Sequence, residues 1–259
     1  MSSKEQSVTL LRVNKRAQVA ALQAVGFSDL TNDAKASEFA KRIKWAGGLL
    51  DICLACVRKS DRHKFYFTTS EWDSLTAANK ARFVFRGLRV RAYGRSFIVA
   101  ASDCVNENLG TTFAWGSSGI ITDVSGKYFG AAYDDFESED NTTQIIATLG
   151  SSNDGCPAAT ACRNYKAFTE GEEADLDFDD DTVWSLPSLG ITRLLYVLRE
   201  EINAVFRSIW GQDSELKNDS YWSSTYADGS NRWYVVLASG QIYYGSTSTA
   251  MRVRPISEE

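Results

Sequence analysis

The sequence predicts an α+β fold, because helical and strand periodicities both occur in separate segments of the chain. Short apolar runs of strand length begin after Gly47 and Gly48. Apolar residues recur at helical spacing between Ile191 and Ile209, and they alternate with other side chains from Trp233 onward. A helix repeats about every 3.6 residues and a strand every second residue, so these segments predict helices together with half-buried strands.

Length and composition favour a folded protein with a substantial core. The chain has 259 residues, enough for one large domain or two ordinary ones, and 44% of them are hydrophobic. An aromatic content of 12% and only three prolines argue against disorder. The formal net charge is -5 and no basic stripe occurs, so neither nucleic acid nor a membrane surface is an expected partner.

The first hundred residues predict a small α+β domain. Helical spacing predicts helices at 13–25 and 32–45, the second capped by Asn32 or Asp33. Strand-like runs follow, separated by a short helix and a hairpin turn. The expected strands are 49–57, 64–68, 87–93 and 96–102, the helix runs from Glu71 to Asn79, and the turn is Tyr93, Gly94 and Arg95. We expect residues 1–104 to serve attachment or assembly.

A second domain is expected at 105–259, because the composition shifts after Cys104 to Asn, Gly, Thr and Ser. Short segments at 113–115 and 120–124 and a helix at 142–149 are its first expected elements, and 151–181 is expected to be mostly loop. In that loop Asp175, Asp177 and Asp179 alternate as in a calcium loop. The positions that need Gly and a bidentate acid hold Asp180 and Leu186, so a solvated loop is favoured.

The C-terminal third has the clearest pattern. A helix is expected between the start signals Pro187 and Ser188 and the stop signal Gly211. In the ribbon that follows, alternation places Trp233, Val235 and Leu237 on a core face. The chain then turns into 241–244 and ends in a strand at 251–256 that stops at Pro255. Trp184, Trp222 and Trp233 are expected to be core residues.

Signals for catalysis, metals and cofactors are weak. Cys53 and Cys56 lie in an apolar run without a second ligand pair, so buried structural thiols are expected, and the five cysteines do not form a disulfide framework. The one histidine, His63, lies in a charged loop without a nucleophile nearby. We predict no catalytic residue, metal or cofactor. Without a signal peptide or a membrane-length apolar run, synthesis and folding in the cytoplasm are expected.

Three segments of the chain carry a family resemblance. WSLPS begins at Trp184, YWSST at Tyr221 and VRPI at Val253, and FAWGSSG, DNTTQII and residues 162–165 match more loosely. The chain resembles the variable proteins of diversity-generating retroelements in gut bacteria and their phages. This resemblance implies a C-type-lectin fold at 105–259 with a variable region at about 221–256. The family usually has an acidic residue where Ile191 stands, so Ser188 lacks a capping-box partner.

The residue types of the ribbon favour a binding surface. Between Asn218 and Ser257 there is no Lys or Glu, although five of the eleven tyrosines lie there. Tyr gives rigid contact area, and Ser, Gly and Asn give adaptable hydrogen bonds. From Tyr226 to Ala250 only Trp233 and Gln241 lie outside the set of residues that adenine-directed mutation gives in the family. The expected ligand-binding residues are Tyr226, Asp228, Ser230, Asn231, Arg232, Tyr234, Gln241, Tyr243, Tyr244, Ser246 and Thr247.

The resemblance implies a non-enzymatic protein that recognises a protein or glycan receptor on a target cell, as a phage-tail protein in the virion. The N-terminal domain could join copies of the chain or another virion protein. Two alternatives remain, a bacterial surface adhesin and a sulfatase-modifying type of enzyme on the same fold. The enzymes use a C-terminal cysteine pair, whereas this chain has no cysteine after Cys162.

Overall fold

The computed structural model describes residues 50–119, 121, 129–151, 155–166 and 182–259. The chain divides into two compact units, Met1–Leu50 with Arg91–Arg95 and Asp51–Val90 with Ser96–Glu259. The second unit contains nearly all of the described elements. The helices expected at 13–25 and 32–45 and the acidic run Glu172 to Asp181 lie outside the described residues.

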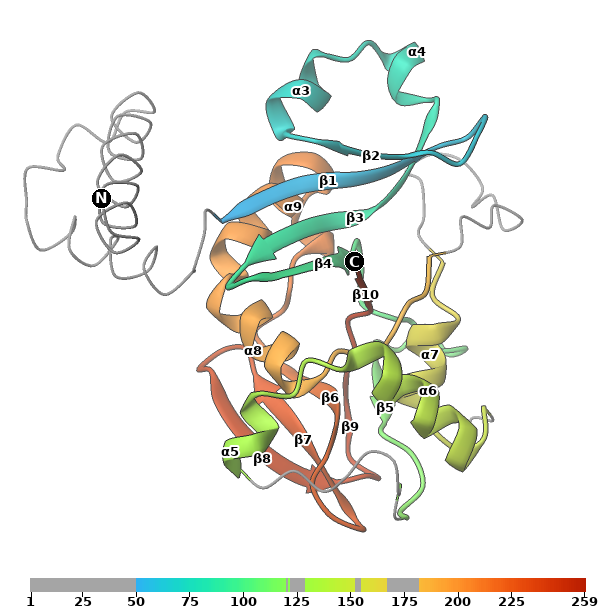
Figure 1. Ribbon diagram of the computed structural model, residues 1–259, viewed down its shortest axis with the longest axis vertical. Coiled ribbons are helices and arrows are strands. Elements are labelled where there is room, and N and C mark those ends of the chain that lie inside the picture. Colours follow the sequence, from blue (N-terminus) through green and yellow to red (C-terminus); the bar gives the residue numbers. More distant parts are fainter. Residues whose placement is uncertain (1–49, 120, 122–128, 152–154, 167–181) are drawn as a thin grey trace, which may run out of the picture. The chain divides into compact units, whose positions relative to one another are not determined.

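The first sheet has five strands in the order β10-β4-β3-β1-β2. The strands are β1 (Asp51–Arg58), β2 (Lys64–Phe67), β3 (Phe83–Ala92), β4 (Arg95–Ala100) and β10 (Ile256–Glu258). β1 pairs antiparallel with β2, and β10 pairs antiparallel with β4, where Ile256 lies opposite Val99. The last strand of the chain therefore extends a sheet that residues 51–100 begin (Figure 1).

The second sheet has the order β5-β9-β6-β7-β8. Its strands are β5 (Thr112–Ala114), β6 (Ser220–Tyr226), β7 (Asn231–Val236), β8 (Gln241–Ser246) and β9 (Ala250–Arg252). β6, β7 and β8 pair antiparallel in sequence order, and β9 runs parallel to β6. Strands β7 and β8 form the ribbon that the alternation predicts, and β8 is the edge strand.

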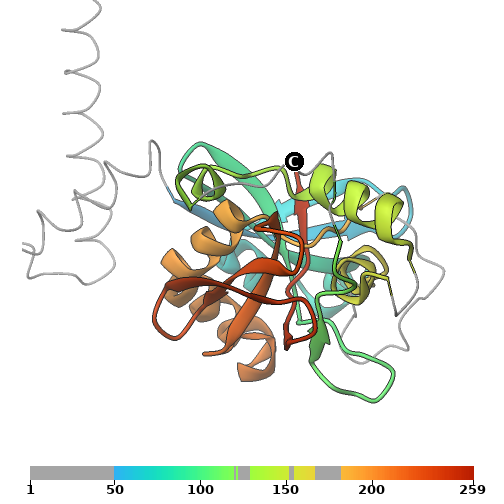
Figure 2. The same cartoon turned by 90° about the horizontal axis from the view of Figure 1, so that it is seen from below.

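Helices complete an α+β architecture, as the sequence predicts. They are α3 (Thr69–Ser74), α4 (Ala77–Lys80), α5 (Phe129–Tyr133), α6 (Ser138–Leu149), α7 (Pro157–Arg163), α8 (Leu189–Val197), α9 (Arg199–Trp210) and the 3₁₀ turn η1 (Gln212–Ser214). α8 packs against β6 and β7, α6 against β6 and β10, and α7 against β5. Figure 2 shows α8 and α9 (orange) on one side of the ribbon and α6 and α7 on the other.

Several element predictions need correction. The helix expected from Glu71 to Asn79 is two short helices, α3 and α4. Among the described residues of 151–181, the segment expected to be mostly loop, 157–163 form α7. The strand expected at 251–256 is split, because residues 253–255 leave the second sheet before β10 joins the first. The expected hairpin turn is confirmed, with φ of 55° at Tyr93 and 74° at Gly94.

The expected aromatic core is confirmed. Trp184, Trp222 and Trp233 are buried, and the Trp222 indole N–H donates to the carbonyl of Phe113 at 3.0 Å. Trp115 lies in the same hydrophobic cluster as Trp222 and donates to the carbonyl of Ser223 at 2.9 Å. Trp115 and Trp222 thus bury their rings and also satisfy their indole N–H groups, which fixes β6 against the β5 segment.

The C-terminal helical stripe is buried, but it belongs to two helices. The chain breaks at Leu198, where φ is -103° and ψ is 11°, so α8 and α9 replace the continuous helix that the sequence predicts. Leu195, Leu198, Ile202 and Phe206 are buried on both sides of this break. The apolar period survives because one residue outside helical geometry hardly changes which face points inward.

We expect Leu198→Ala to lower the free energy of unfolding by about 2–5 kcal/mol, because a buried leucine loses contacts and leaves a cavity. Chemical denaturation followed by circular dichroism measures the change. Ala204→Ser on the exposed face of α9 is the control and should change stability by less than about 0.5 kcal/mol. Equal effects of the two substitutions would contradict a core role for Leu198.

Tertiary contacts satisfy the start of α8. Ser188 is the N-cap, as expected, but its hydroxyl makes no capping bond. Instead, Thr225 Oγ1 accepts from the Leu189 N–H at 2.8 Å, and the Asp135 carbonyl accepts from the Gly190 N–H at 2.8 Å. The helix therefore does not need the acidic capping-box residue that Ile191 replaces, because β6 and the segment before α6 supply the acceptors.

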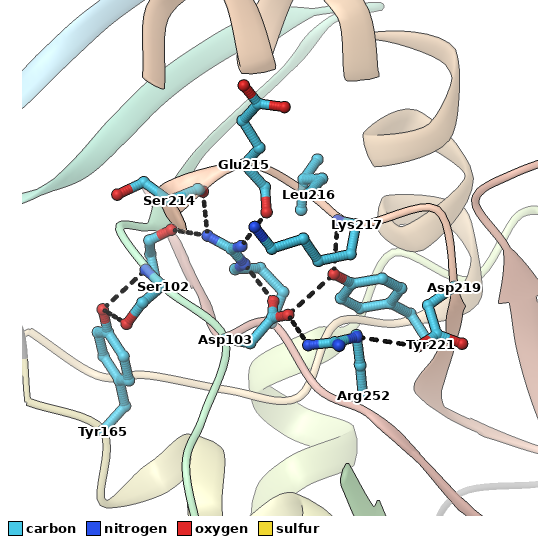
Figure 3. A network of polar contacts seen from close by, with 12 residues as sticks. Ser102, Asp103, Tyr165, Ser214, Glu215, Leu216, Lys217, Asp219, Tyr221 and Arg252 are labelled. Atoms are coloured by element: carbon cyan, nitrogen blue, oxygen red, sulfur yellow. Dashed lines mark hydrogen bonds and ion pairs between the residues drawn. The ribbon is translucent and has the colours of Figure 1, made fainter. Parts of the chain in front are cut away.

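A buried carboxylate joins the two sheets. Asp103 follows β4, and its Oδ1 accepts from Arg254 Nε at 2.7 Å, while its Oδ2 accepts from Tyr221 Oη at 3.0 Å and Arg252 Nη1 at 3.1 Å (Figure 3). Arg254 is fully buried and also donates to the carbonyls of Ala100, Ser214 and Glu215. Asp103 thus binds Tyr221, the first residue of YWSST, and also both arginines of the C-terminal segment.

The boundary predicted at 104–105 falls inside one compact unit of the chain. β10 pairs with β4 across it, and Asp103 bonds to Tyr221, Arg252 and Arg254 beyond it. These contacts favour a single folding unit for residues 51–259, a point that a truncation experiment tests below.

The cysteines are free and buried. Cys53 and Cys56 lie on β1 as expected, and burial raises the pKa of Cys53 to about 11 and also raises the pKa of Cys56. A thiol with such a pKa is protonated at neutral pH and is a poor nucleophile. His63 lies exposed before β2, also as expected.

Candidate ligand-binding surface

The ribbon of β7 and β8 has one face against the helices. Trp233, Val235 and Leu237 are buried there, as the alternation predicts. Tyr234 and Val236 point to the other face and are half-buried. The strands are in continuous register, with Trp233 opposite Tyr244 and Tyr234 opposite Tyr243. Tyr243 and Tyr244, which are adjacent in β8, therefore lie on opposite faces of the sheet.

Tyr243 and Tyr244 are the large side chains that this edge presents to solvent. Their exposed fractions are 45% and 59%. The ring of Tyr244 meets Trp233 edge-on at 5.4 Å, and the ring of Tyr243 lies 5.8 Å from that of Tyr234. Each exposed tyrosine is thus supported by a more buried aromatic residue, which limits its rotamer freedom before any ligand binds.

On one face of the sheet, three aromatic rings from β6, β7 and β8 form a row that ends at Tyr243. Trp222 is fully buried, Tyr234 is half-buried and Tyr243 is exposed. Trp222 and Tyr234 meet edge-on with centroids 5.7 Å apart. Burial decreases along the row toward the edge of the sheet, so the last ring, Tyr243, is the one of the three that is exposed to a ligand.

The turn between β6 and β7 is rigid and polar. The Asp228 carboxylate accepts hydrogen bonds from the backbone N–H groups of Ser230 and Asn231 at 2.9 Å each and from the Asn231 side chain. The bond from the Asn231 side chain is the main cause that lowers the pKa of Asp228. Asp228 and Ser230 are exposed, so this turn presents a fixed arrangement of polar groups.

Three of the eleven expected ligand-binding residues are buried, which corrects the prediction that they face solvent. They are Tyr226, Arg232 and Thr247, with exposed fractions of 7%, 0% and 5%. The register shifts between Trp222 and Tyr226, so simple alternation does not hold at that end of β6. The remaining eight residues are exposed or half-buried, and they are Asp228, Ser230, Asn231, Tyr234, Gln241, Tyr243, Tyr244 and Ser246.

The buried Arg232 side chain stabilises the β6–β7 turn. Its guanidinium carbon lies 4.2 Å from the Trp115 ring centroid and 4.6 Å from that of Tyr226. Nη1 donates to the carbonyls of Asp228 and Asn231, and Nη2 donates to that of Gly119 at 3.0 Å. Burial lowers the pKa of Arg232 to about 10, so the group stays charged at neutral pH. The carbonyl dipoles and the faces of the two aromatic rings stabilise its positive charge.

Sequence reasoning missed a neighbour of this surface. Residues 117–119 lie beside the β6–β7 turn, where the Gly119 N–H donates to the Gly229 carbonyl at 2.9 Å. Ser117 and Ser118 are exposed. FAWGSSG includes all three residues, yet its place in the sequence, more than one hundred residues before the ribbon, gives no sign of this contact.

A separate hollow lies at the opposite edge of the sheet. Its volume is about 350 Å³. It is lined by Val105, Asn106, Glu107, Asn108, Thr112, Phe113, Ala114, Pro157, Thr160, Ala161 and Asn164. None of the expected ligand-binding residues lines it, and it is bounded by β5, α7 and the turn before β5.

Within the described ranges, no three His, Cys, Asp or Glu side chains are grouped so that they could hold a metal ion. Likewise, none of the helices described is long and apolar enough to cross a membrane.

Comparisons with known proteins give little. No family model matches the chain, and no curated protein matches it. Among solved structures, a fimbrial protein from Bacteroides ovatus is similar, with a TM-score of 0.45 and 13% sequence identity. The match covers 63% of this chain and 36% of that one, so this chain spans little more than a third of the fimbrial protein.

Proposed function

We propose that the chain is a non-enzymatic binding protein that displays a ligand-binding surface on a C-type-lectin-like fold. The observation that carries the proposal is the edge strand β8, where Tyr243 and Tyr244 are 45% and 59% exposed in a segment without charged residues. Tyrosines of this kind act as anchors in recognition surfaces, and the polar side chains of the β6–β7 turn can satisfy groups around them.

The resemblance to retroelement variable proteins supports the same surface. YWSST corresponds to the buried strand β6, and the eight expected binding residues that are exposed or half-buried lie on the β6–β7 turn, β7 and β8. We propose that the target is a receptor on a cell surface and that the chain belongs to a phage tail.

The test is a variant that removes the surface and spares the core. Asp228, Asn231, Tyr243 and Tyr244 are replaced together by Ala or Ser. We expect a melting curve close to that of the parent, because these side chains are exposed or half-buried. Adsorption of the intact phage particle to its host should be lost or redirected.

Leu109→Ala is the matched control, since this 84% exposed side chain lies in the turn before β5, at the opposite edge of the sheet. Normal adsorption by the folded quadruple variant would place recognition elsewhere in the chain. Unfolding of that variant would show that the four side chains belong to the core.

A further inference from the structure

The ligand-binding surface ends in an open sheet edge. β8 contributes six residues in uninterrupted register with β7, and the described residues pair no strand with its other side. Alternate residues of an antiparallel edge strand direct their N–H and C=O groups toward the neighbour and the others direct them outward. The Thr247 N–H donates to the Ser230 carbonyl, one step beyond the ladder of β7 and β8.

That bond fixes which groups are outward. The Thr247 N–H points toward the strand that Ser230 precedes, so by alternation the main-chain groups of Gly245, Tyr243 and Gln241 face β7. Ile242 and Tyr244 therefore present their main-chain N–H and C=O groups at the edge, and Ser246 presents its N–H, since its carbonyl accepts from the Thr249 N–H at 3.0 Å. The groups repeat every second residue, at about 6.8 Å along the strand.

Features that normally prevent pairing are missing from β8. Edge strands are usually protected by Lys or other charges, by Pro, or by a bulge. Residues 241–246 are Gln, Ile, Tyr, Tyr, Gly and Ser, and the register with β7 has no bulge. The strand at the other edge of this sheet, β5, has only three residues, and α7 packs against it.

We propose that the ligand is an extended polypeptide segment that adds to the sheet as an antiparallel or parallel neighbour of β8. The inference rests on the proposed function and names the chemistry of its partner. A row of amide groups at strand spacing is complemented by another peptide backbone, whereas saccharide hydroxyls do not repeat at that spacing. The ligand strand is uncharged and carries β-branched or aromatic residues, because such side chains pair well with Tyr243 on one face and with Ile242 and Tyr244 on the other.

This arrangement separates affinity from specificity. Main-chain bonds do not depend on the side chains of β8, so they persist when those side chains change. Tyr243 and Tyr244 then determine which extended segment fits.

The test uses a phage-displayed library of random decapeptides and a glycan array, each presented to the full-length chain. We expect enriched peptides with alternating apolar residues. Ile242→Pro removes an outward N–H and leaves the bonds to β7 in place, so it should weaken these peptides by about tenfold or more. Ile242→Ala removes the side chain but keeps the N–H, and it should bind within about threefold of the parent.

Several outcomes would overturn the strand proposal: no enriched peptide, equal binding by the two Ile242 variants, or weakening confined to Ile242→Ala. If Ile242→Pro fails to fold, Ser246→Pro at the end of the strand repeats the measurement. A glycan that binds Ile242→Pro normally and is lost in the quadruple surface variant would overturn the strand proposal and leave the proposed function intact. Failure of the proposed function would instead appear as normal host adsorption by that quadruple variant.

Discussion

Asp103→Ala should lower the free energy of unfolding by about 3–5 kcal/mol, because it leaves a buried guanidinium without its acid. Arg254 is fully buried, and its Nε lies 2.7 Å from Asp103 Oδ1. Burial alone would lower the pKa of Arg254. The charge of Asp103 opposes this effect, and the pKa is raised overall. Without the acid, the carbonyls around Arg254 remain, but no described carboxylate within bonding distance neutralises it.

The control is Asp219→Ala. Asp219 also pairs with an arginine, since its Oδ2 lies 3.0 Å from Arg252 Nε, but its side chain is 51% exposed. Exposed pairs contribute about 0–1 kcal/mol, so this variant should melt nearly as the parent does. The denaturant midpoint of unfolding is measured for both variants. Similar losses of stability would show that Asp103 does not hold the cluster together.

A fragment of residues 105–259 should show no cooperative melt. It lacks β4, which pairs with β10, and it lacks Asp103, which binds Tyr221, Arg252 and Arg254. Tyr221 and Arg254 would then be buried without their acceptor, Arg252 would keep only Asp219, and the edge of β10 would be open. Differential scanning calorimetry measures the transition.

A fragment of residues 51–259 is the matched comparison and should melt cooperatively, because it keeps both sheets. A cooperative transition in the shorter fragment would instead support an independent domain after residue 104, as the composition of the sequence suggests.

Local patterns were enough to predict many elements. The presence of four strands between residues 51 and 100 follows from short-range periodicity, although β3 begins at Phe83, before the expected residue 87. The turn at Tyr93 and Gly94 and the buried face of Trp233, Val235 and Leu237 follow from local patterns as well. The end of α9 before Gly211 follows from a stop signal, and Gly211 has a φ of 79°. These features are set by neighbours within a few residues, which a single sequence contains.

Long-range features could not be predicted in the same way. The alternation rule treats the outer face of a ribbon as solvent, yet Arg232 lies under Trp115 and Tyr226, which come from other strands or segments. The composition change after Cys104 suggests a boundary, but the bonds of Asp103 cross it. The break at Leu198 also has no local signal, since no Gly or Pro occurs there.

The clamp between Gly119 and the β6–β7 turn has a consequence for redesign. The Gly119 N–H holds the Gly229 carbonyl, and the Gly119 carbonyl receives Arg232. Libraries confined to the ribbon would vary side chains while the backbone of the β6–β7 turn stays in place. Lengthening or shortening the segment at Ser117 and Ser118 would move these two contacts, so a second, small library there would reposition the β6–β7 turn without altering any residue of the ribbon.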